Sequence, residues 1–160
     1  MDKQLNIHYQ EFADENALPL QDRELLRQAE TMASKAYAPY SRFKVGAAVR
    51  LANGVVVCGS NQENAAYPSG LCAERVAVFS AAANYPDQAI EALAITTQAE
   101  KASGDPVAPC GACRQSILEY EHKFQQPIRV ILRGKNGKIL VLDSVRSLLP
   151  FQFSAEDMGL

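Results

Sequence analysis

The sequence predicts one α/β domain, built as a three-layer α/β/α sandwich around a five-stranded mixed sheet. Two observations support this fold class: apolar residues recur with helical spacing in some segments and alternate with strand spacing in others, and Asn-Gly turns separate two pairs of strand-like segments. A third is length, because 160 residues suit one core and are few for two. Apolar residues in the first twenty positions are too irregularly spaced to predict an element, so we expect an N-terminal extension over residues 1–20 and a single domain over residues 21–160.

The expected helices differ in how much of their surface is apolar. In the first, apolar residues fall at offsets 0, 1, 4, 7, 8 and 11, the stripe of an amphipathic helix. The second is apolar nearly all round, so we expect it to be buried against more than one neighbour. The expected helical segments are Asp22–Ala36, Cys72–Asn84, Cys110–His122 and a short Ser144–Leu149.

The expected strands begin with a hairpin. Residues Phe43–Leu51 alternate apolar and other side chains, and Asn53-Gly54 then gives a turn before Val55–Cys58. The remaining strands are expected at Ile90–Thr97, Pro127–Arg133 and Lys138–Leu142, with a loop over Gln98–Pro109.

Composition narrows the classes of partner. Charged residues are 21% of the chain and the net charge is -2, which gives no field that would concentrate nucleic acid or anionic lipid. No stretch approaches the roughly 18 apolar residues of a membrane span, and the N-terminus has no secretory pattern. We expect a cytoplasmic protein without a nucleic-acid or membrane partner. Its four cysteines should then stay reduced and be available for metal binding or catalysis.

Two of these cysteines form a Cys-x-x-Cys pair, Cys110 and Cys113. Such a pair can be half of a structural zinc site, a redox dithiol or two buried thiols. A redox motif would follow a strand, whereas a polar loop precedes this pair. A closed zinc site needs four ligands, and the sequence offers only Cys72 in addition. Three thiolates with one open position match a catalytic zinc.

The segment around Cys72 adds a carboxyl group and a guanidinium group to the thiols. Glu74 in a first helical turn is favoured by the helix dipole whatever its function, but beside a ligand it becomes a candidate proton carrier. Three thiolates around Zn²⁺ leave a net charge of about -1, which Arg75 could offset by donating hydrogen bonds to the sulfurs. Arg114 is a second candidate for that role, or else an exposed helix cation.

These motifs resemble a known family. Cys72-Ala73-Glu74-Arg75 together with Pro109-Cys110-Gly111-Ala112-Cys113-Arg114-Gln115 is similar to the zinc-dependent cytidine deaminases, in their small three-cysteine form. The resemblance continues through residues 40–48, 61–65 and 148–150, and covers about residues 25–158. It implies a cytidine deaminase-like fold and one zinc ion per chain, held by Cys72, Cys110 and Cys113.

The resemblance also implies a reaction. Glu74 would take a proton from the zinc-bound water, pass it to the pyrimidine ring nitrogen and later protonate the departing ammonia. The hydroxide would attack the ring carbon that bears the amino group. The expected activity is hydrolysis of cytidine and deoxycytidine to uridine and deoxyuridine in pyrimidine salvage.

Contacts to a nucleoside substrate follow by the same resemblance. Asn61 and Glu63 would bind the ribose hydroxyls, and their spacing puts both on one side of an extended segment. Phe43 would form a wall against the base, or else be an ordinary core residue, and the backbone of Ala73 would lie near the base carbonyl. Such enzymes are typically homotetramers with shared active sites, so Tyr67 and Phe153 could act across interfaces or simply pack locally.

Two other functions remain open at this level. The same scaffold could deaminate a cytosine-containing antibiotic nucleoside, although Asn61 with Glu63 favours an ordinary ribose. Alternatively, the metal could only stabilise a binding module, which would require four protein ligands and no exchangeable water.

Overall fold

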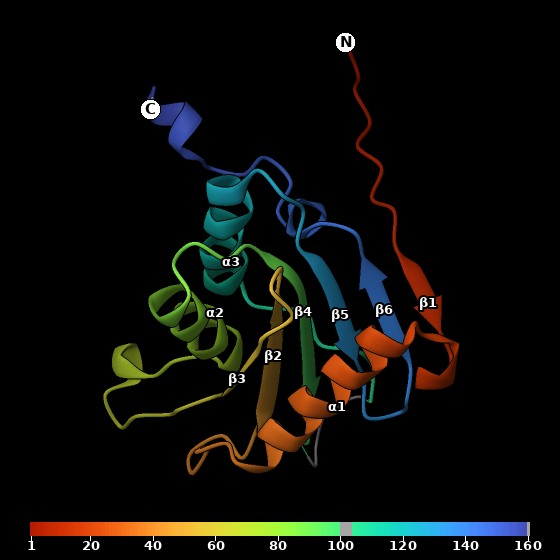
Figure 1. The fold of residues 1–160 in the computed structure, drawn as a ribbon, viewed down its shortest axis with the longest axis vertical. Helices are drawn as coiled ribbons and strands as arrows, with labels where there is room; N and C mark the ends of the chain where they lie inside the picture. The colour runs from red at the N-terminus through yellow and green to blue at the C-terminus, as the bar shows by residue number, and fades with distance from the viewer. Residues whose placement is uncertain (100–103, 160) are drawn as a thin grey trace.

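The computed structural model describes residues 1–99 and 104–159. Their centre is a six-stranded sheet in the order β1-β6-β5-β4-β2-β3, in which β4 and β5 are parallel and all other neighbours are antiparallel (Figure 1). The sheet is therefore mixed, as predicted. The strands are β1 (Gln10–Phe12), β2 (Val45–Leu51), β3 (Val56–Ser60), β4 (Ile90–Thr97), β5 (Arg129–Arg133) and β6 (Ile139–Leu142).

Helices cover both faces of the sheet. Helix α1 (Leu20–Ser34) packs on one face, where Leu25, Leu26 and Ala29 join a buried cluster with residues of β2, β4, β5 and β6. Helices α2 (Ala73–Asn84) and α3 (Gly111–Phe124) pack on the other face and share a larger cluster. The predicted three-layer arrangement is what Figure 1 shows.

The prediction of five strands is wrong because the N-terminal extension supplies a sixth. Strand β1 pairs antiparallel with β6 at the edge of the sheet. Its three residues are too few for a visible alternation, and an edge strand needs little apolar surface because main-chain hydrogen bonds hold it. Lys138 and Glu11 add an ion pair across the same edge, at 3.2 Å.

Other boundaries differ by a few residues. The segment predicted as a last helix is a 3-10 helix, Val145–Leu148. The first hairpin strand begins at Val45 instead of Phe43, because the Phe43 carbonyl and the Val45 amide bond to the side chain of Asn61. Part of the loop expected over Gln98–Pro109 lies outside the described residues.

The direction of the strands explains where α2 and α3 begin. Strands β3 and β4 are both antiparallel to β2, so they run in the same direction. Their carboxyl ends therefore lie at the same end of the strands of the sheet. The chain passes from β3 into α2 and from β4 into α3. The N-termini of α2 and α3 therefore lie close together at this end of the sheet.

Gly59 allows α2 to lie close against β3. A Cβ at this position would come within 2.6 Å of both the Ala73 carbonyl oxygen and the Ala77 nitrogen. The close approach holds the first turn of α2 against the end of the hairpin, beside the residues that follow β3.

Candidate active site

Three thiols gather where the two helices begin. Cys72 is the N-cap residue of α2, Cys110 is the N-cap of α3, and Cys113 lies in the first turn of α3. All three Sγ atoms lie within 4.8 Å of one another, with 3.5 Å between those of Cys110 and Cys113. Cys113 is buried, Cys72 half-buried and Cys110 exposed. The structure thus brings together the three cysteines that the sequence singled out.

The thiols differ in how readily they lose a proton. The hydrogen bond from Cys113, helped by Arg75, lowers the pKa of the Cys72 thiol to about 5. The pKa of Cys113 is raised because its thiol is hydrogen-bonded to Cys72 and is buried. Thiols that are packed this closely share protons through hydrogen bonds. A metal cation can take the place of those protons, because metal binding to thiols releases them.

The cluster fits zinc. Tetrahedral Zn–S bonds of about 2.3 Å put sulfurs roughly 3.8 Å apart, which is compatible with the spacing of these thiols. Within residues 1–99 and 104–159, no fourth acidic, cysteine or histidine side chain joins the cluster. Three protein ligands with one position open are the composition of catalytic zinc sites, not of closed structural ones.

Glu74 lies beside the thiols without belonging to their cluster. It sits in the first turn of α2 and is only 5% exposed. Burial raises the pKa of its carboxyl group, and the negative charge of Cys72 raises it further. A carboxyl group whose pKa is raised can hold a proton as well as release one, as a general acid and base must.

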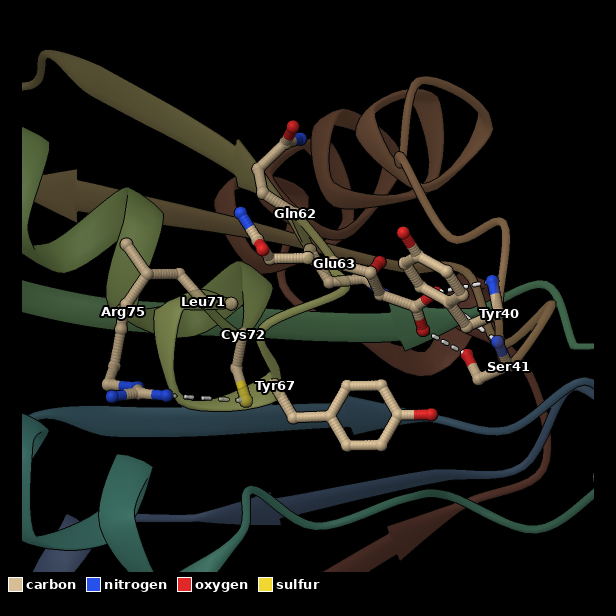
Figure 2. A pocket seen from close by; sticks show the side chains of 11 residues that line it. Tyr40, Ser41, Gln62, Glu63, Tyr67, Leu71, Cys72 and Arg75 are labelled. Carbon is tan, nitrogen blue, oxygen red and sulfur yellow. Dashed lines mark hydrogen bonds between the residues drawn. The ribbon is translucent and has the colours of Figure 1, made fainter.

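The two arginines that follow the motifs have different partners. Nη2 of Arg75 lies 4.0 Å from the Cys72 sulfur, so its charge is beside a candidate metal ligand (Figure 2). Arg114 instead donates from Nε to the Pro109 carbonyl at 2.7 Å and from Nη1 to the Leu148 carbonyl at 2.8 Å. It therefore clamps the residue before Cys110, a role that neither expectation for Arg114 anticipated.

Two connected hollows lie beside the thiols. One, of about 390 Å³, is lined by Phe43, Ala73 and Glu74 together with the thiols of Cys72 and Cys110. The other, of about 540 Å³, opens past Tyr40, Tyr67 and Arg75. Ser41, Asn61, Glu63 and Cys72 line both hollows. Their sizes fall in the usual range for small-molecule sites.

Asn61 and Glu63 both bind the segment that precedes β2. The Asn61 side chain donates to the Phe43 carbonyl at 2.9 Å and accepts from the Val45 amide at 2.8 Å. The Glu63 carboxylate accepts from the amides of Tyr40 and Ser41, at 2.9 and 3.2 Å, and from the Ser41 hydroxyl. These bonds, led by the one from the hydroxyl, lower the pKa of Glu63. Sequence reasoning gave Ser41 no role.

The two aromatic residues expected at interfaces are exposed. Tyr67 is 77% exposed and contacts Tyr40 edge-on, with ring centroids 6.3 Å apart. Phe153 is 57% exposed, and its carbonyl accepts from Gln115 at 2.9 Å. Both residues are thus largely exposed to solvent in the described part of the chain.

Comparison with known proteins agrees with this site. Residues 19–125 match the family model of the cytidine and deoxycytidylate deaminase zinc-binding region. A cytidine deaminase of Halalkalibacterium halodurans is 41% identical over 139 residues, which span 86% of this chain and 98% of that protein. A cytidine deaminase of Mycobacterium tuberculosis is 40% identical over 145 residues, spanning 88% of this chain and 96% of that protein.

Solved structures give the same result. The crystal structure of a cytidine deaminase from Burkholderia pseudomallei superposes with a TM-score of 0.71 at 40% identity, over 81% of this chain and 97% of that one. The matched region contains both helix N-termini and all three thiols. The chain belongs to the cytidine and deoxycytidylate deaminase zinc-binding family.

Proposed function

We propose that this protein hydrolyses cytidine and deoxycytidine to uridine and deoxyuridine with release of ammonia. The observation that carries the proposal is the position of Glu74, a buried carboxyl group that lines the same hollow as the thiol cluster but stands outside it. An acid and base beside an open metal site is the arrangement that hydrolytic deamination requires.

The metal would be one zinc ion per chain, held by Cys72, Cys110 and Cys113. When bound, zinc lowers the pKa of a water molecule and so supplies a nucleophile at neutral pH. Arg75 would offset part of the charge of the three thiolates, which otherwise weakens the metal as a Lewis acid.

Glu74 would carry the proton through the reaction. The water oxygen bonds to the ring carbon that bears the amino group, and the carbon–nitrogen bond then breaks. Glu74 would take a proton from the water and deliver it to the ring nitrogen. It would then take the second proton from the oxygen now bonded to the ring carbon and pass it to the amino group, which leaves as ammonia. Its raised pKa supports this role, since the carboxyl group must hold the proton between these steps.

The remaining residues would bind the nucleoside. Phe43 and the backbone of Ala73 would contact the base, since both line the hollow beside the thiols. Asn61 and Glu63 would bind the sugar at the seam between the two hollows.

We also infer a homotetramer whose active sites are shared, acting in pyrimidine salvage in the cytoplasm, where thiol ligands stay reduced. Exposed Tyr67 and Phe153 support shared sites, because large aromatic side chains are enriched at interfaces. No helix of the described residues has the length and apolar character needed to cross a bilayer. Light scattering coupled to size exclusion tests the assembly: a monomer that turns over cytidine at full rate would contradict it.

The catalytic proposal is tested by Glu74→Gln, which keeps the shape of the side chain and removes its acid–base function. We expect kcat for cytidine, followed by ultraviolet absorbance, to fall by about 10²–10⁴-fold. Zinc content should stay near that of the parent protein. Substantial turnover by the variant would exclude Glu74 as the proton carrier, and a parent protein with bound zinc but no activity on cytidine would favour a structural metal.

A further inference from the structure

The Ser41 hydroxyl lies between two groups that face the substrate hollow. Its oxygen accepts a hydrogen bond from the Phe43 amide at 3.0 Å. The hydroxyl donates a hydrogen bond to Oε1 of Glu63 (Figure 2). It therefore links the residue proposed to contact the base with the carboxylate proposed to bind the sugar.

The acceptor sites of Glu63 are almost fully used by the chain itself. An ionised carboxylate offers about four lone-pair sites. Its Oε2 accepts from the amides of Tyr40 and Ser41, and its Oε1 accepts from the Ser41 hydroxyl. One acceptor site on Oε1 is left for a substrate, and it requires a donor such as a sugar hydroxyl.

The backbone of this segment is shaped for these contacts. Arg42 has φ of 56°, in the left-handed region that non-glycine residues rarely adopt. The Arg42 amide bonds to the Ala38 carbonyl at 3.1 Å, which closes the turn around Ser41. The amide and the hydroxyl of Ser41 can then reach the same carboxylate. Ser41 is itself exposed, so its contacts add little to the core of the domain.

We propose that Ser41 is a positioning residue for sugar recognition: it orients Glu63 so that the remaining acceptor meets the 3′-hydroxyl of the nucleoside. This inference rests on the proposed function. The 3′-hydroxyl is chosen because cytidine and deoxycytidine both carry it at the ring.

The test compares Ser41→Ala and Ser41→Thr on two substrates, cytidine and 2′,3′-dideoxycytidine. With cytidine, we expect Ser41→Ala to raise KM about tenfold at nearly constant kcat, because a Glu63 carboxylate that is no longer oriented loses its hydrogen bond to the sugar in both the ground and transition states. Ser41→Thr keeps a hydroxyl and should restore most of the affinity. With dideoxycytidine, the KM of Ser41→Ala should equal that of the parent protein.

A cycle with Glu63→Ala checks that the effect passes through the carboxylate. The double variant Ser41→Ala/Glu63→Ala should bind cytidine no more weakly than Glu63→Ala alone. Additive losses would overturn the inference, and so would an equal rise in KM on both substrates or no rise on cytidine. Failure of the proposed function is distinguishable, because the parent protein would then not deaminate cytidine at all. Thermal unfolding of each variant shows whether the fold is intact.

Discussion

The active-site region has two halves that are built differently. The metal half consists of Cys72, Cys110, Cys113 and Glu74 at two helix N-termini that pack on the sheet. The sugar half consists of Asn61 and Glu63, which bind residues 40–45 across a loop. In the first half, core packing sets the positions and leaves the sulfurs available to a cation. In the second half, hydrogen bonds to residues 40–45 set the positions of Asn61 and Glu63. These bonds occupy most of the donor and acceptor atoms of the two side chains.

This difference predicts two kinds of variant. Changes in the metal half should alter metal content and kcat, because we propose that the groups there contact the ion or move the proton. Changes in the sugar half should alter KM and local order, because the groups there bind the backbone and are proposed to bind the substrate as well. The comparison fails if variants of either half produce the effects expected for the other.

The largest effect is expected for Cys113→Ser, since Cys113 is a fully buried ligand candidate. The variant should lose most of its zinc, and turnover should fall by more than about 10³-fold, because without the metal the pKa of water is far too high to give a hydroxide nucleophile at neutral pH. Metal analysis and the cytidine assay measure both. Cys58→Ser is the matched control: this half-buried cysteine lies outside the cluster and should leave both quantities unchanged. Full activity of a zinc-free Cys113→Ser protein would disprove the metal assignment.

A smaller effect is expected for Arg114→Met, which keeps the volume of the side chain and loses both carbonyl contacts. Without the clamp on Pro109, the loop that carries Cys110 should relax, and zinc should leave about 10–100-fold faster. Release to a coloured chelator measures this rate. Arg114→Lys can reach one carbonyl but not both. Its rate of zinc release should therefore lie between those of the parent protein and Arg114→Met.

Arg27→Met controls for the loss of an arginine, because Arg27 pairs with Glu15 at 2.8 Å on the surface. It should release zinc at the parent rate. Equal release from all of these proteins would show that Arg114 does not hold the loop in place.

The smallest effect is expected for Asn61→Ala, in the sugar half. The part-buried Val45 amide loses its partner, so the free energy of unfolding should fall by about 1–3 kcal/mol. The KM for cytidine should rise about tenfold with little change in zinc content. Urea unfolding and steady-state kinetics measure the two effects.

Asn53→Ala is the matched control for this change. Asn53 also accepts from a backbone amide, that of Val55 at 3.1 Å, but in an exposed turn away from the site. It should leave KM unaltered. If Asn61→Ala instead lost zinc, the two halves would not be separable.

The sequence was most informative about the metal half. Cys72, Glu74 and Arg75 are adjacent in the chain, and Cys110 and Cys113 share one helical turn. Their spacing in the chain already predicts which of these side chains lie close together, because a helix fixes which neighbours share a face. Periodicity likewise located every strand longer than three residues among the described residues. The start of β2 shifted from Phe43 to Val45, because the Asn61 side chain bonds the backbone there in place of a neighbouring strand. The family resemblance supplied the proposed roles of Asn61 and Glu63 in sugar binding, which spacing alone did not.

The tertiary structure decided what depends on residues far apart in the chain. Ser41 reaches Glu63 across 22 residues, and Arg114 reaches Leu148 across 34. Strand β1 exists because β6 offers it an unpaired edge, and its own residues carry almost no signal. By itself the sequence determined the helices, the longer strands and the three thiols with their carboxyl group, because these follow from local periodicity and spacing. Only the folded chain determined which backbone groups clamp the site, because those partners meet after the sheet has set the distance between them.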